Sequence, residues 1–321
     1  MARKIAGDDL AMRVAVFGCG AMGSIYAGLM ASNGHEVICI DRNRAHVDAI
    51  NGKGLRVSGA SGDRTVKVQA FTDAPDKKVD LLVIALKAAF VAATVDAKKM
   101  IDKNSSVLTI QNGLGSADIV ADIFGSDRLI VGVAQGFGAF LQEPGHSHHN
   151  DMKAIRMGRY EKQSGARLEE VVKVFSGSGL DTQAADNIEV IQWEKLICNV
   201  AYSGPCALTG MTVGEILDDP VMGPVSRAAA VEAWEIAKRR GIPIAVDDPI
   251  KYVREFAARM RAAKPSVLLD IEAGRRSEID VINGAVEREA ARVDAVAPVN
   301  ATLTALVRSL EKRTIDKGKL K

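Results

Sequence analysis

The sequence has few of the features that mark a protein for a membrane, for nucleic acid or for disulfide cross-linking. No apolar run approaches the roughly 18 residues of a membrane span, and the first eleven residues lack the apolar core of a signal peptide. The 42 basic and 40 acidic residues are interspersed and give a formal charge of +2, without the basic face that nucleic acid requires. We therefore expect a cytoplasmic protein that binds neither membrane nor nucleic acid, with residues 1–11 forming a loose tail.

Cysteine and histidine are also scarce, with four and five residues respectively and no C-x-x-C pair. Cys19 and Cys39 lie in a glycine turn and an apolar run, where a small buried residue fits, so we expect reduced thiols. Three of the histidines are crowded into the stretch 145–150. No cysteine or further histidine completes a ligand set there. We interpret this stretch as a polar hairpin loop and expect no metal site.

What the sequence does contain is enough apolar material for two cores. The chain has 321 residues, of which 47% are hydrophobic, and two domains are the default at this length. Apolar runs alternate with helical stretches up to about residue 184, whereas the remainder is almost wholly helical in pattern, with breaks near 203–205, 241–243, Pro265 and Pro298. We therefore predict an α/β protein: a doubly wound, Rossmann-type sheet domain at 12–187, followed by an all-helical domain at 188–321.

The stretch from Arg13 to Asp41 carries the most informative single pattern. An apolar run is followed by a G-x-G-x-x-G turn, a helix of small residues, a second apolar run and an acid. This succession is the fingerprint of a dinucleotide-binding unit; an unrelated glycine-rich loop, the alternative, needs neither the strand before it nor the acid after it. The phosphates of the cofactor would meet the positive end of the helix. We expect them to be bound by Gly18, Gly20, Ala21, Met22 and Gly23.

Polar residues follow three of the apolar runs, where parallel strands would end. Asp41 follows the run at 37–40, Lys87 follows that at 79–86, and Asn112 comes shortly after that at 106–110. Ligands of doubly wound sheets bind beyond the carboxyl ends of the strands. We therefore expect these three residues to reach a bound cofactor. The alternatives are a solvated helix start at Lys87 and an ordinary Asn-Gly turn at Asn112.

Two helical stretches of the second half carry polar residues among apolar ones. Lys195, Asn199 and Ser203 recur at intervals of four, which places them on one face of a helix in a row about 12 Å long. In the other stretch, Ser266, Asp270 and Glu278 would share a sector of about 120° if the segment were helical throughout. Both stripes could be ordinary solvated faces. Buried Lys and Glu side chains need partners, however, so an active site is the other interpretation.

These motifs together resemble the ketopantoate reductase (2-dehydropantoate 2-reductase) family, over roughly residues 13–311. That family joins an N-terminal dinucleotide fold to a helical C-terminal domain. The matching pieces are Gly18–Gly23, Leu86–Ala88, Gln111–Gly113, Trp193–Leu196 with Asn199, Ser266 with Asp270, Ser277–Asp280 with Asn283–Gly284, and Pro298–Asn300.

The resemblance implies that a reduced nicotinamide, NADP(H) or NAD(H), delivers hydride to a small 2-oxo acid, with ketopantoate the first candidate. Lys195 matches the general acid of the family and Glu278 its substrate-binding acid. Asn112, Asn199, Ser203 and Ser266 would position the substrate with support from Asp270, and the cofactor site would extend to Asp41, Arg42, Lys87 and Asn112.

Two departures from the family pattern leave alternatives open. Ser203 stands where the family usually has a second asparagine, so a related hydroxy or oxo acid could be the substrate. Asp41 and Arg42 stand where the family commonly has a small residue and a base; an acid there favours NAD(H), whereas Arg42 and Lys87 favour the 2′-phosphate of NADP(H). A non-catalytic dinucleotide sensor is a third interpretation. A homodimer is an assembly that the sequence leaves open.

Overall fold

The structure is a computed structural model that describes residues 11–136, 138–151, 154–161 and 166–319. The chain folds as two compact units, of which the first comprises Met1–Gln111 and Ser116–Ile188 and the second Asn112–Gly115 and Glu189–Lys321. Most of the predicted N-terminal tail, residues 1–10, lies outside the described residues. Among those that are described, none of the helices combines the length and the apolar character that crossing a membrane requires.

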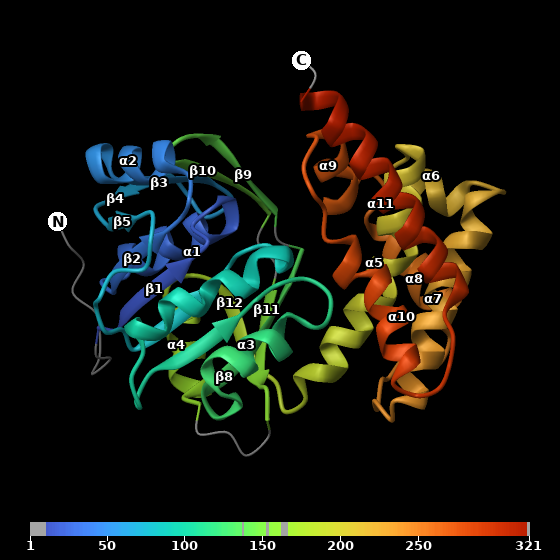
Figure 1. Ribbon diagram of the computed structural model, residues 1–321, viewed down its shortest axis with the longest axis horizontal. Coiled ribbons are helices and arrows are strands. Elements are labelled where there is room, and N and C mark those ends of the chain that lie inside the picture. Colours follow the sequence, from blue (N-terminus) through green and yellow to red (C-terminus); the bar gives the residue numbers. More distant parts are fainter. Residues whose placement is uncertain (1–10, 137, 152–153, 162–165, 320–321) are drawn as a thin grey trace. The chain divides into compact units, whose positions relative to one another are not determined.

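The first unit is built on an eight-stranded sheet in the order β12, β11, β8, β7, β6, β1, β2, β5 (Figure 1). The strands are β1 (Arg13–Phe17), β2 (Glu36–Ile40), β5 (Gln69–Phe71), β6 (Leu81–Ile84), β7 (Ser106–Thr109), β8 (Leu129–Gln135), β11 (Ala154–Arg159) and β12 (Asp181–Ala184). Neighbouring strands are parallel except for β8 and β11. The predicted doubly wound sheet is confirmed.

The apolar runs become strands because both faces of the sheet are covered. All four residues of β6 are fully buried, as are Val14, Ala15 and Val16 of β1, which is why these runs lack the alternation of a one-sided sheet. The helical segments of this unit are α1 (Ala21–Ser32), α2 (Arg44–Lys53), η1 (Ala88–Met100), α3 (Ser116–Phe124), η2 (Ser126–Arg128) and α4 (Leu168–Gly177).

The helical segment that begins after Lys87 has an unusual geometry. It is a 3₁₀ helix, η1. Its buried side chains recur at every third position: Ala88, Val91, Thr94, Ala97 and Met100. Because a 3₁₀ helix has three residues per turn, this spacing gathers all of them on one face.

A second, four-stranded sheet covers α1 from its other side. Its order is β4 (Arg64–Val66), β3 (Leu55–Gly59), β10 (His146–Asp151), β9 (Gly138–Glu143), and its strands β3 and β4 are antiparallel. A Cβ on Gly28 of α1 would overlap the side chain of Val57. The helix therefore packs against this sheet at a distance that only glycine permits.

The histidine-rich stretch belongs to this second sheet. It forms β10, paired with β3 and β9, so the prediction of a hairpin loop was wrong. The Ser58 hydroxyl lies 2.8 Å from His146 Nε2 and 3.1 Å from His148 Nδ1, and strand pairing orders these rings. Within the described part of the chain, no cluster of three or more His, Cys, Asp or Glu residues could hold a metal ion.

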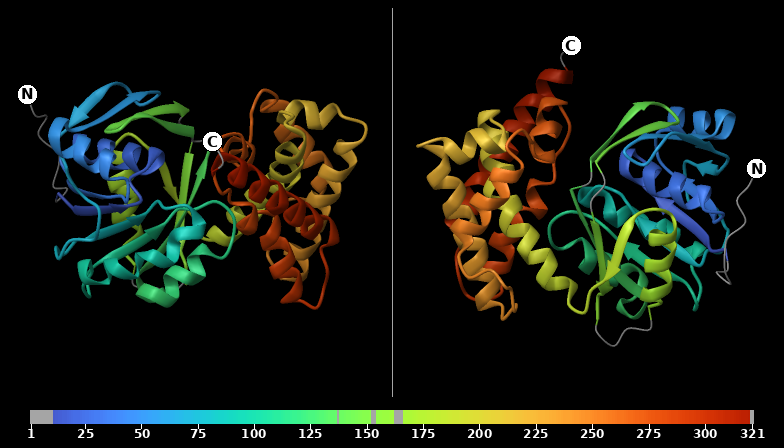
Figure 2. Two further views of the ribbon diagram at one scale, coloured as in Figure 1. Left: turned by 45° about the horizontal axis from the view of Figure 1, so that its top comes forward. Right: turned by 180° about the vertical axis from the view of Figure 1, so that it is seen from behind.

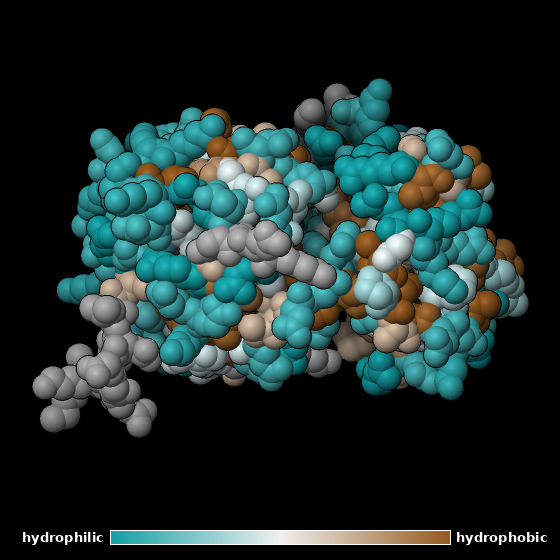
Figure 3. Space-filling model, turned by 90° about the horizontal axis from the view of Figure 1, so that it is seen from below, coloured by the Kyte–Doolittle hydropathy of each residue, from teal (hydrophilic) through white to brown (hydrophobic). Residues whose placement is uncertain are grey.

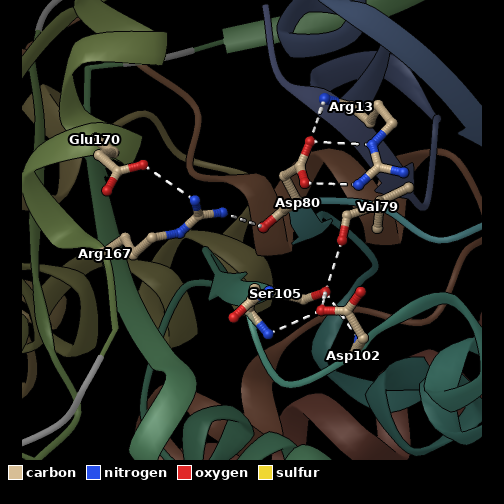
Figure 4. A network of polar contacts seen from close by, with 8 residues as sticks. Arg13, Val79, Asp80, Asp102, Ser105, Arg167 and Glu170 are labelled. Carbon is tan, nitrogen blue, oxygen red and sulfur yellow. Dashed lines mark hydrogen bonds and ion pairs between the residues drawn. The ribbon is translucent and has the colours of Figure 1, made fainter. Parts of the chain in front are cut away.

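A polar network joins the amino ends of the central strands, at the edge opposite the glycine turn (Figure 4). The Asp80 carboxylate accepts hydrogen bonds from the backbone and guanidinium of Arg13, at 2.8–3.2 Å. Arg167 donates to the carbonyl of Asp80, and the Ser105 hydroxyl donates to that of Val79. The Arg13 guanidinium holds the pKa of Asp80 below its ordinary value. These bonds link the strands at their amino ends, away from their carboxyl ends.

Helices make up the second unit, and the two views in Figure 2 show them from different sides. They are α5 (Ile188–Thr209), α6 (Val213–Asp218), α7 (Met222–Arg239), α8 (Pro249–Arg259), α9 (Ser266–Glu272), η3 (Ile279–Val281), α10 (Asn283–Ala291) and α11 (Pro298–Lys319). Their core includes Trp193, Leu196 and Ile197 from α5. On the face shown in Figure 3, hydrophilic residues predominate and hydrophobic ones are interspersed among them.

Helix α5 continues past the predicted break at 203–205 and is supported there by buried contacts with other helices. Pro205 lies inside the helix, where it lacks an N–H donor. One turn earlier, Asn283 Nδ2 donates to the carbonyl of Val200 at 3.0 Å and to Asn300 Oδ1 at 2.9 Å. Asn283 and Asn300 are fully buried. This buried pair holds α5 against α10 and α11.

The segment that contains Glu278 is not one continuous helix, so Ser266, Asp270 and Glu278 do not share the sector that a continuous helix would give them. Helix α9 ends at Glu272, and Gly274 follows with φ +65°. The N–H of Gly274 donates to the carbonyl of Ile271, and that of Arg275 to the carbonyl of Asp270. This is a Schellman motif, for which glycine is the preferred residue. Glu278 comes after the motif, directly before η3.

Candidate active site

The three glycines after β1 each occupy a position with its own requirement. Gly18 has φ +91°, and a Cβ on it would lie 2.6 Å from the backbone nitrogen of Leu86. A Cβ on Gly23 would overlap the carbonyl oxygen of Gly18, whereas one on Gly20 would meet no atom within 4 Å. The first and third positions therefore exclude a side chain for reasons internal to the fold. The space beside the second is open, as the approach of a pyrophosphate requires.

Helix α1 begins at this turn, and its first N–H groups have no partner within the helix. Its N-cap is Gly20, and no side chain caps its first turn by a hydrogen bond. The N–H groups of Ala21 and Met22 belong to that first turn, where a helix carries a partial positive charge. An uncapped glycine-rich helix start of this kind fits the diphosphate of a dinucleotide.

The polar residues at the strand ends lie on two sides of the glycine turn. Strand β1 has β2 and β6 as its two neighbours. Asp41 follows β2, and its Oδ1 accepts the N–H of Asn43 at 2.9 Å, with the exposed Arg42 next to it. Lys87 lies beyond β6, at the start of η1. The sheet therefore places Asp41 and Lys87 at opposite flanks of the turn.

Gln111, to which the sequence motif assigns no separate role, ties the ends of two strands together. Its Nε2 donates to the carbonyls of Ile84 and Leu86, at 2.7 and 3.1 Å, and its Oε1 accepts the hydroxyl of Thr109. These bonds anchor the chain directly before Asn112. The sequence signal for this role is that a polar residue directly follows an apolar run.

Residues 112–115 belong to the second unit although they follow β7 of the first, so the predicted domain limits of 12–187 and 188–321 do not describe them. The N–H of Leu114 donates to the carbonyl of Val281 at 2.9 Å. Gly113 has φ +78°, and a Cβ on it would overlap that same carbonyl. Arg288 also donates to the carbonyl of Leu114, at 3.2 Å. This short segment is thereby held beside η3 and α10.

Asn112, Lys195 and Glu278 form a chain of hydrogen bonds within the second unit. Lys195 Nζ donates to Asn112 Oδ1 at 2.6 Å, and Asn112 Nδ2 lies 3.5 Å from Glu278 Oε2. The three side chains come from α5, from the segment after β7 and from the residue before η3. The amide of Asn112 thus joins an amine and a carboxylate that are 83 residues apart in the sequence.

Burial shifts the pKa of Lys195, the lysine of this group. Desolvation lowers the pKa of Lys195 to about 8, and the negative charge of Glu278 opposes that shift only in part. An ammonium with a pKa of about 8 is mostly protonated at neutral pH and yet releases its proton readily. The group therefore has the protonation state and the acidity of a general acid.

The other predicted site residues differ in burial and in their contacts. Asn199 and Ser203 lie on α5 at one and two turns from Lys195, and Ser203 is 4% exposed. Ser266 is the first residue of α9 and is exposed. The buried Asp270 accepts hydrogen bonds from Arg275 at 3.1 and 3.2 Å. Asp270 therefore fixes the loop that leads to Glu278.

A second anchor of that loop, Glu311, was missed at the sequence level. Glu311 lies on α11, is 8% exposed, and its Oε1 accepts both the backbone N–H of Ser277 at 2.9 Å and the Ser277 hydroxyl. The Ser277 hydroxyl in turn accepts the N–H of Ile279. Glu278 is thus held between two residues that are both fixed. A lone acid in an amphipathic helix gives no signal of this role.

We expect Glu311→Ala to loosen Glu278, the residue to which the family resemblance assigns substrate binding. Two hydrogen bonds to a buried carboxylate are lost, so unfolding free energy should fall by about 2 to 3 kcal/mol, and the KM for the oxo acid should rise about tenfold with a smaller change in kcat. Glu311→Gln retains the acceptor oxygen and should restore most of both quantities. Denaturant unfolding and steady-state kinetics measure these effects. An unchanged KM in the alanine variant would contradict the role.

Comparison with known proteins identifies the family. The family model "Ketopantoate reductase PanE/ApbA" matches residues 14–162, and the model "Ketopantoate reductase PanE/ApbA C terminal" matches residues 187–311. The chain belongs to the ketopantoate reductase family. Both units contribute to the match, and the resemblance drawn from the sequence motifs is confirmed.

Relatives of known name agree over nearly the whole chain. A 2-dehydropantoate 2-reductase of Pyrococcus horikoshii is 32% identical over 300 residues, 94% of this chain and 98% of that protein. A PanE/ApbA family ketopantoate reductase from Ralstonia eutropha JMP134 has a TM-score of 0.86 at 30% identity, and D-mandelate dehydrogenase in complex with NADH has 0.84 at 25%; each alignment covers 94% of this chain and 99% of that one. As a ketopantoate reductase family member, the chain is a nicotinamide-dependent oxidoreductase.

Proposed function

We propose that this chain reduces a small 2-oxo acid to the 2-hydroxy acid, with ketopantoate as the first substrate to test. The observation that carries the proposal is the hydrogen-bonded chain of Lys195, Asn112 and Glu278. Family membership supports the reaction class, and the names of the relatives support the substrate.

In the proposed reaction, NADH or NADPH, held at the glycine turn of residues 18–23, would supply a hydride to the ketone carbon. The ketone oxygen then becomes an alkoxide and takes a proton from Lys195 Nζ, which balances the reaction as ketone plus hydride plus proton giving alcohol. Asn112 Oδ1 holds Nζ in place at 2.6 Å. Until the proton moves, the ammonium stabilises the growing negative charge on the oxygen.

Glu278 and the polar face of α5 would hold the rest of the substrate. A carboxylate accepts a hydrogen bond from a substrate hydroxyl, and Asn199 offers an amide one turn from Lys195. Ser203, one turn further, can offer only a hydroxyl. We propose that these residues orient the oxo acid so that its ketone oxygen lies at Lys195.

The direct test is a turnover assay with purified protein. Nicotinamide absorbance should fall when ketopantoate is added with NADH or NADPH, and a panel of 2-oxo acids that differ in size and in the presence of a hydroxyl should define the preference. A variant Ser203→Asn, which supplies the group usual in the family, should improve ketopantoate relative to bulkier acids. Binding of dinucleotide without oxidation across the whole panel would contradict the proposal and favour a dinucleotide sensor.

A second candidate function is the reduction of a related 2-oxo acid in place of ketopantoate. Two observations favour it: Ser203 leaves more room than the asparagine usual in the family, and D-mandelate dehydrogenase is among the structural neighbours. In the same panel, an aromatic or bulky 2-oxo acid with a kcat/KM well above that of ketopantoate would establish this candidate.

A further inference from the structure

We propose that Asp41 makes this chain selective for NADH over NADPH. The inference rests on the proposed dinucleotide site in the first unit but not on the choice of oxo acid. It concerns the adenosine end of the cofactor, at the carboxyl end of β2, where a carboxylate typically binds the ribose 2′-hydroxyl and a nearby arginine accommodates a 2′-phosphate. Both kinds of residue are present here, so the structure must decide between them.

The carboxylate of Asp41 is fixed in place by the backbone. Its Oδ1 accepts the N–H of Asn43 at 2.9 Å, while its own N–H donates to the carbonyl of Phe71 in the neighbouring strand β5. Asn43 in turn caps α2 by accepting the N–H of His46. The second carboxylate oxygen has no partner among the residues that the structure describes, so it can accept a ribose hydroxyl without first losing a bond.

The basic side chains near Asp41 are less favourably placed to bind a 2′-phosphate. Lys87 follows β6, which lies on the other side of β1 from β2. Two strand spacings of about 4.8 Å separate it from the end of β2, so its backbone is on the nicotinamide flank of the glycine turn. Arg42 and Arg44 are near enough, but both are exposed. Holding either long side chain against a phosphate costs rotamer entropy.

A second acid increases the negative charge at this edge. Strand β5 adjoins β2 in parallel, and Asp73 follows it by two residues. A 2′-phosphate with nearly two negative charges would therefore meet a fixed carboxylate at hydrogen-bond distance and a further acid at the next strand end. A ribose hydroxyl meets a fixed acceptor instead. The neutral group is favoured because the repulsion acts at short range, whereas the attraction depends on mobile side chains.

Binding measurements on the full-length protein test this inference without any turnover. We expect nicotinamide fluorescence titrations to give a Kd for NADH at least tenfold below that for NADPH, which corresponds to about 1.4 kcal/mol. AMP and adenosine 2′,5′-bisphosphate differ only in the 2′-phosphate, and competition with them should show the same order. This pair assigns the preference to the adenosine end.

Two variants separate the acid from its neighbour. Asp41→Asn keeps an oxygen for the Asn43 N–H and removes the charge, so NADPH should bind at least tenfold more tightly than in the unmodified protein while the melting temperature stays unchanged. Arg42→Ala removes the adjacent base and should change the Kd for NADPH less than Asp41→Asn does. Equal or tighter binding of NADPH by the unmodified protein would overturn the inference. Absence of binding for both nucleotides would overturn the dinucleotide site itself, and failure of every oxo acid with normal NADH binding would overturn only the proposed reaction.

Discussion

Lys195→Met is expected to lower kcat for 2-oxo acid reduction by 10²-fold to 10⁴-fold, the usual contribution of a positioned general acid. Methionine fills a similar volume but has no proton to give to the alkoxide. Lys195→Arg should lose nearly as much, because a guanidinium keeps the charge but does not release its proton. Stopped-flow or steady-state nicotinamide absorbance measures the loss. Turnover within threefold of the unmodified enzyme in the methionine variant would show that another group supplies the proton.

The pH dependence of kcat is a second measurement of the role of Lys195. The reduction needs the protonated amine, and the pKa of Lys195 is lowered to about 8 by burial. We therefore expect kcat for reduction to be flat below about pH 8 and to fall roughly tenfold per pH unit above it. Oxidation of the hydroxy acid needs the neutral amine and should show the opposite slope. Glu278→Gln removes the charge that opposes the shift, so the midpoint should move to lower pH.

Lys251→Met is the matched control for loss of a positive charge. Lys251 lies on α8 in the same unit and is exposed. Its replacement should leave kcat and the pH midpoint unchanged. The unfolding free energy of Lys195→Met should not fall either, because a lysine with a lowered pKa destabilises the folded state while it is charged. A loss of activity in Lys195→Met together with a loss of folding would therefore contradict the assigned role.

Gly20→Ala and Gly23→Ala are expected to separate cofactor binding from folding. A Cβ on Gly20 meets no protein atom within 4 Å, so unfolding free energy should stay within about 0.5 kcal/mol. The methyl group would occupy the approach of the pyrophosphate, so the Kd for the dinucleotide should rise at least tenfold. A Cβ on Gly23 would overlap the Gly18 carbonyl, so this variant should lose about 3 kcal/mol of stability.

Gly52→Ala serves as the control for the glycine pair. Gly52 lies on α2, and a Cβ there also meets nothing within 4 Å. This variant should bind dinucleotide normally and be slightly more stable, because alanine is the better helix former. Chemical unfolding and fluorescence titration measure both quantities. Normal dinucleotide binding by a folded Gly20→Ala variant would show that the pyrophosphate does not pass beside this turn.

The sequence was sufficient to predict an element where its local pattern and its tertiary environment agree. The strand before Gly18, the turn and α1 follow from four apolar residues, three glycines and a run of small residues. The row of Lys195, Asn199 and Ser203 follows from helical periodicity alone. Even the unusual geometry of η1 has a counterpart in the spacing of its buried residues by three, although the prediction did not use it.

Sequence reasoning failed where a distant residue changes what a local signal means. Pro205 predicts a break, but Asn283 and Asn300 support α5 from other helices. Gly274 ends α9 in a Schellman motif, and this places Glu278 after the helix rather than on it. Glu311 looks like any acid in an amphipathic helix, and only its contact with Ser277 reveals what it holds.

By itself, the sequence determined the family, the dinucleotide turn and the identity of the polar residues, because these depend on short-range spacing. The tertiary structure alone decided that the amide of Asn112 joins Lys195 to Glu278 and that Asp41 and Lys87 flank the turn on opposite sides. Such relations depend on strand order and on contacts across many tens of residues, and helical or strand periodicity does not encode them.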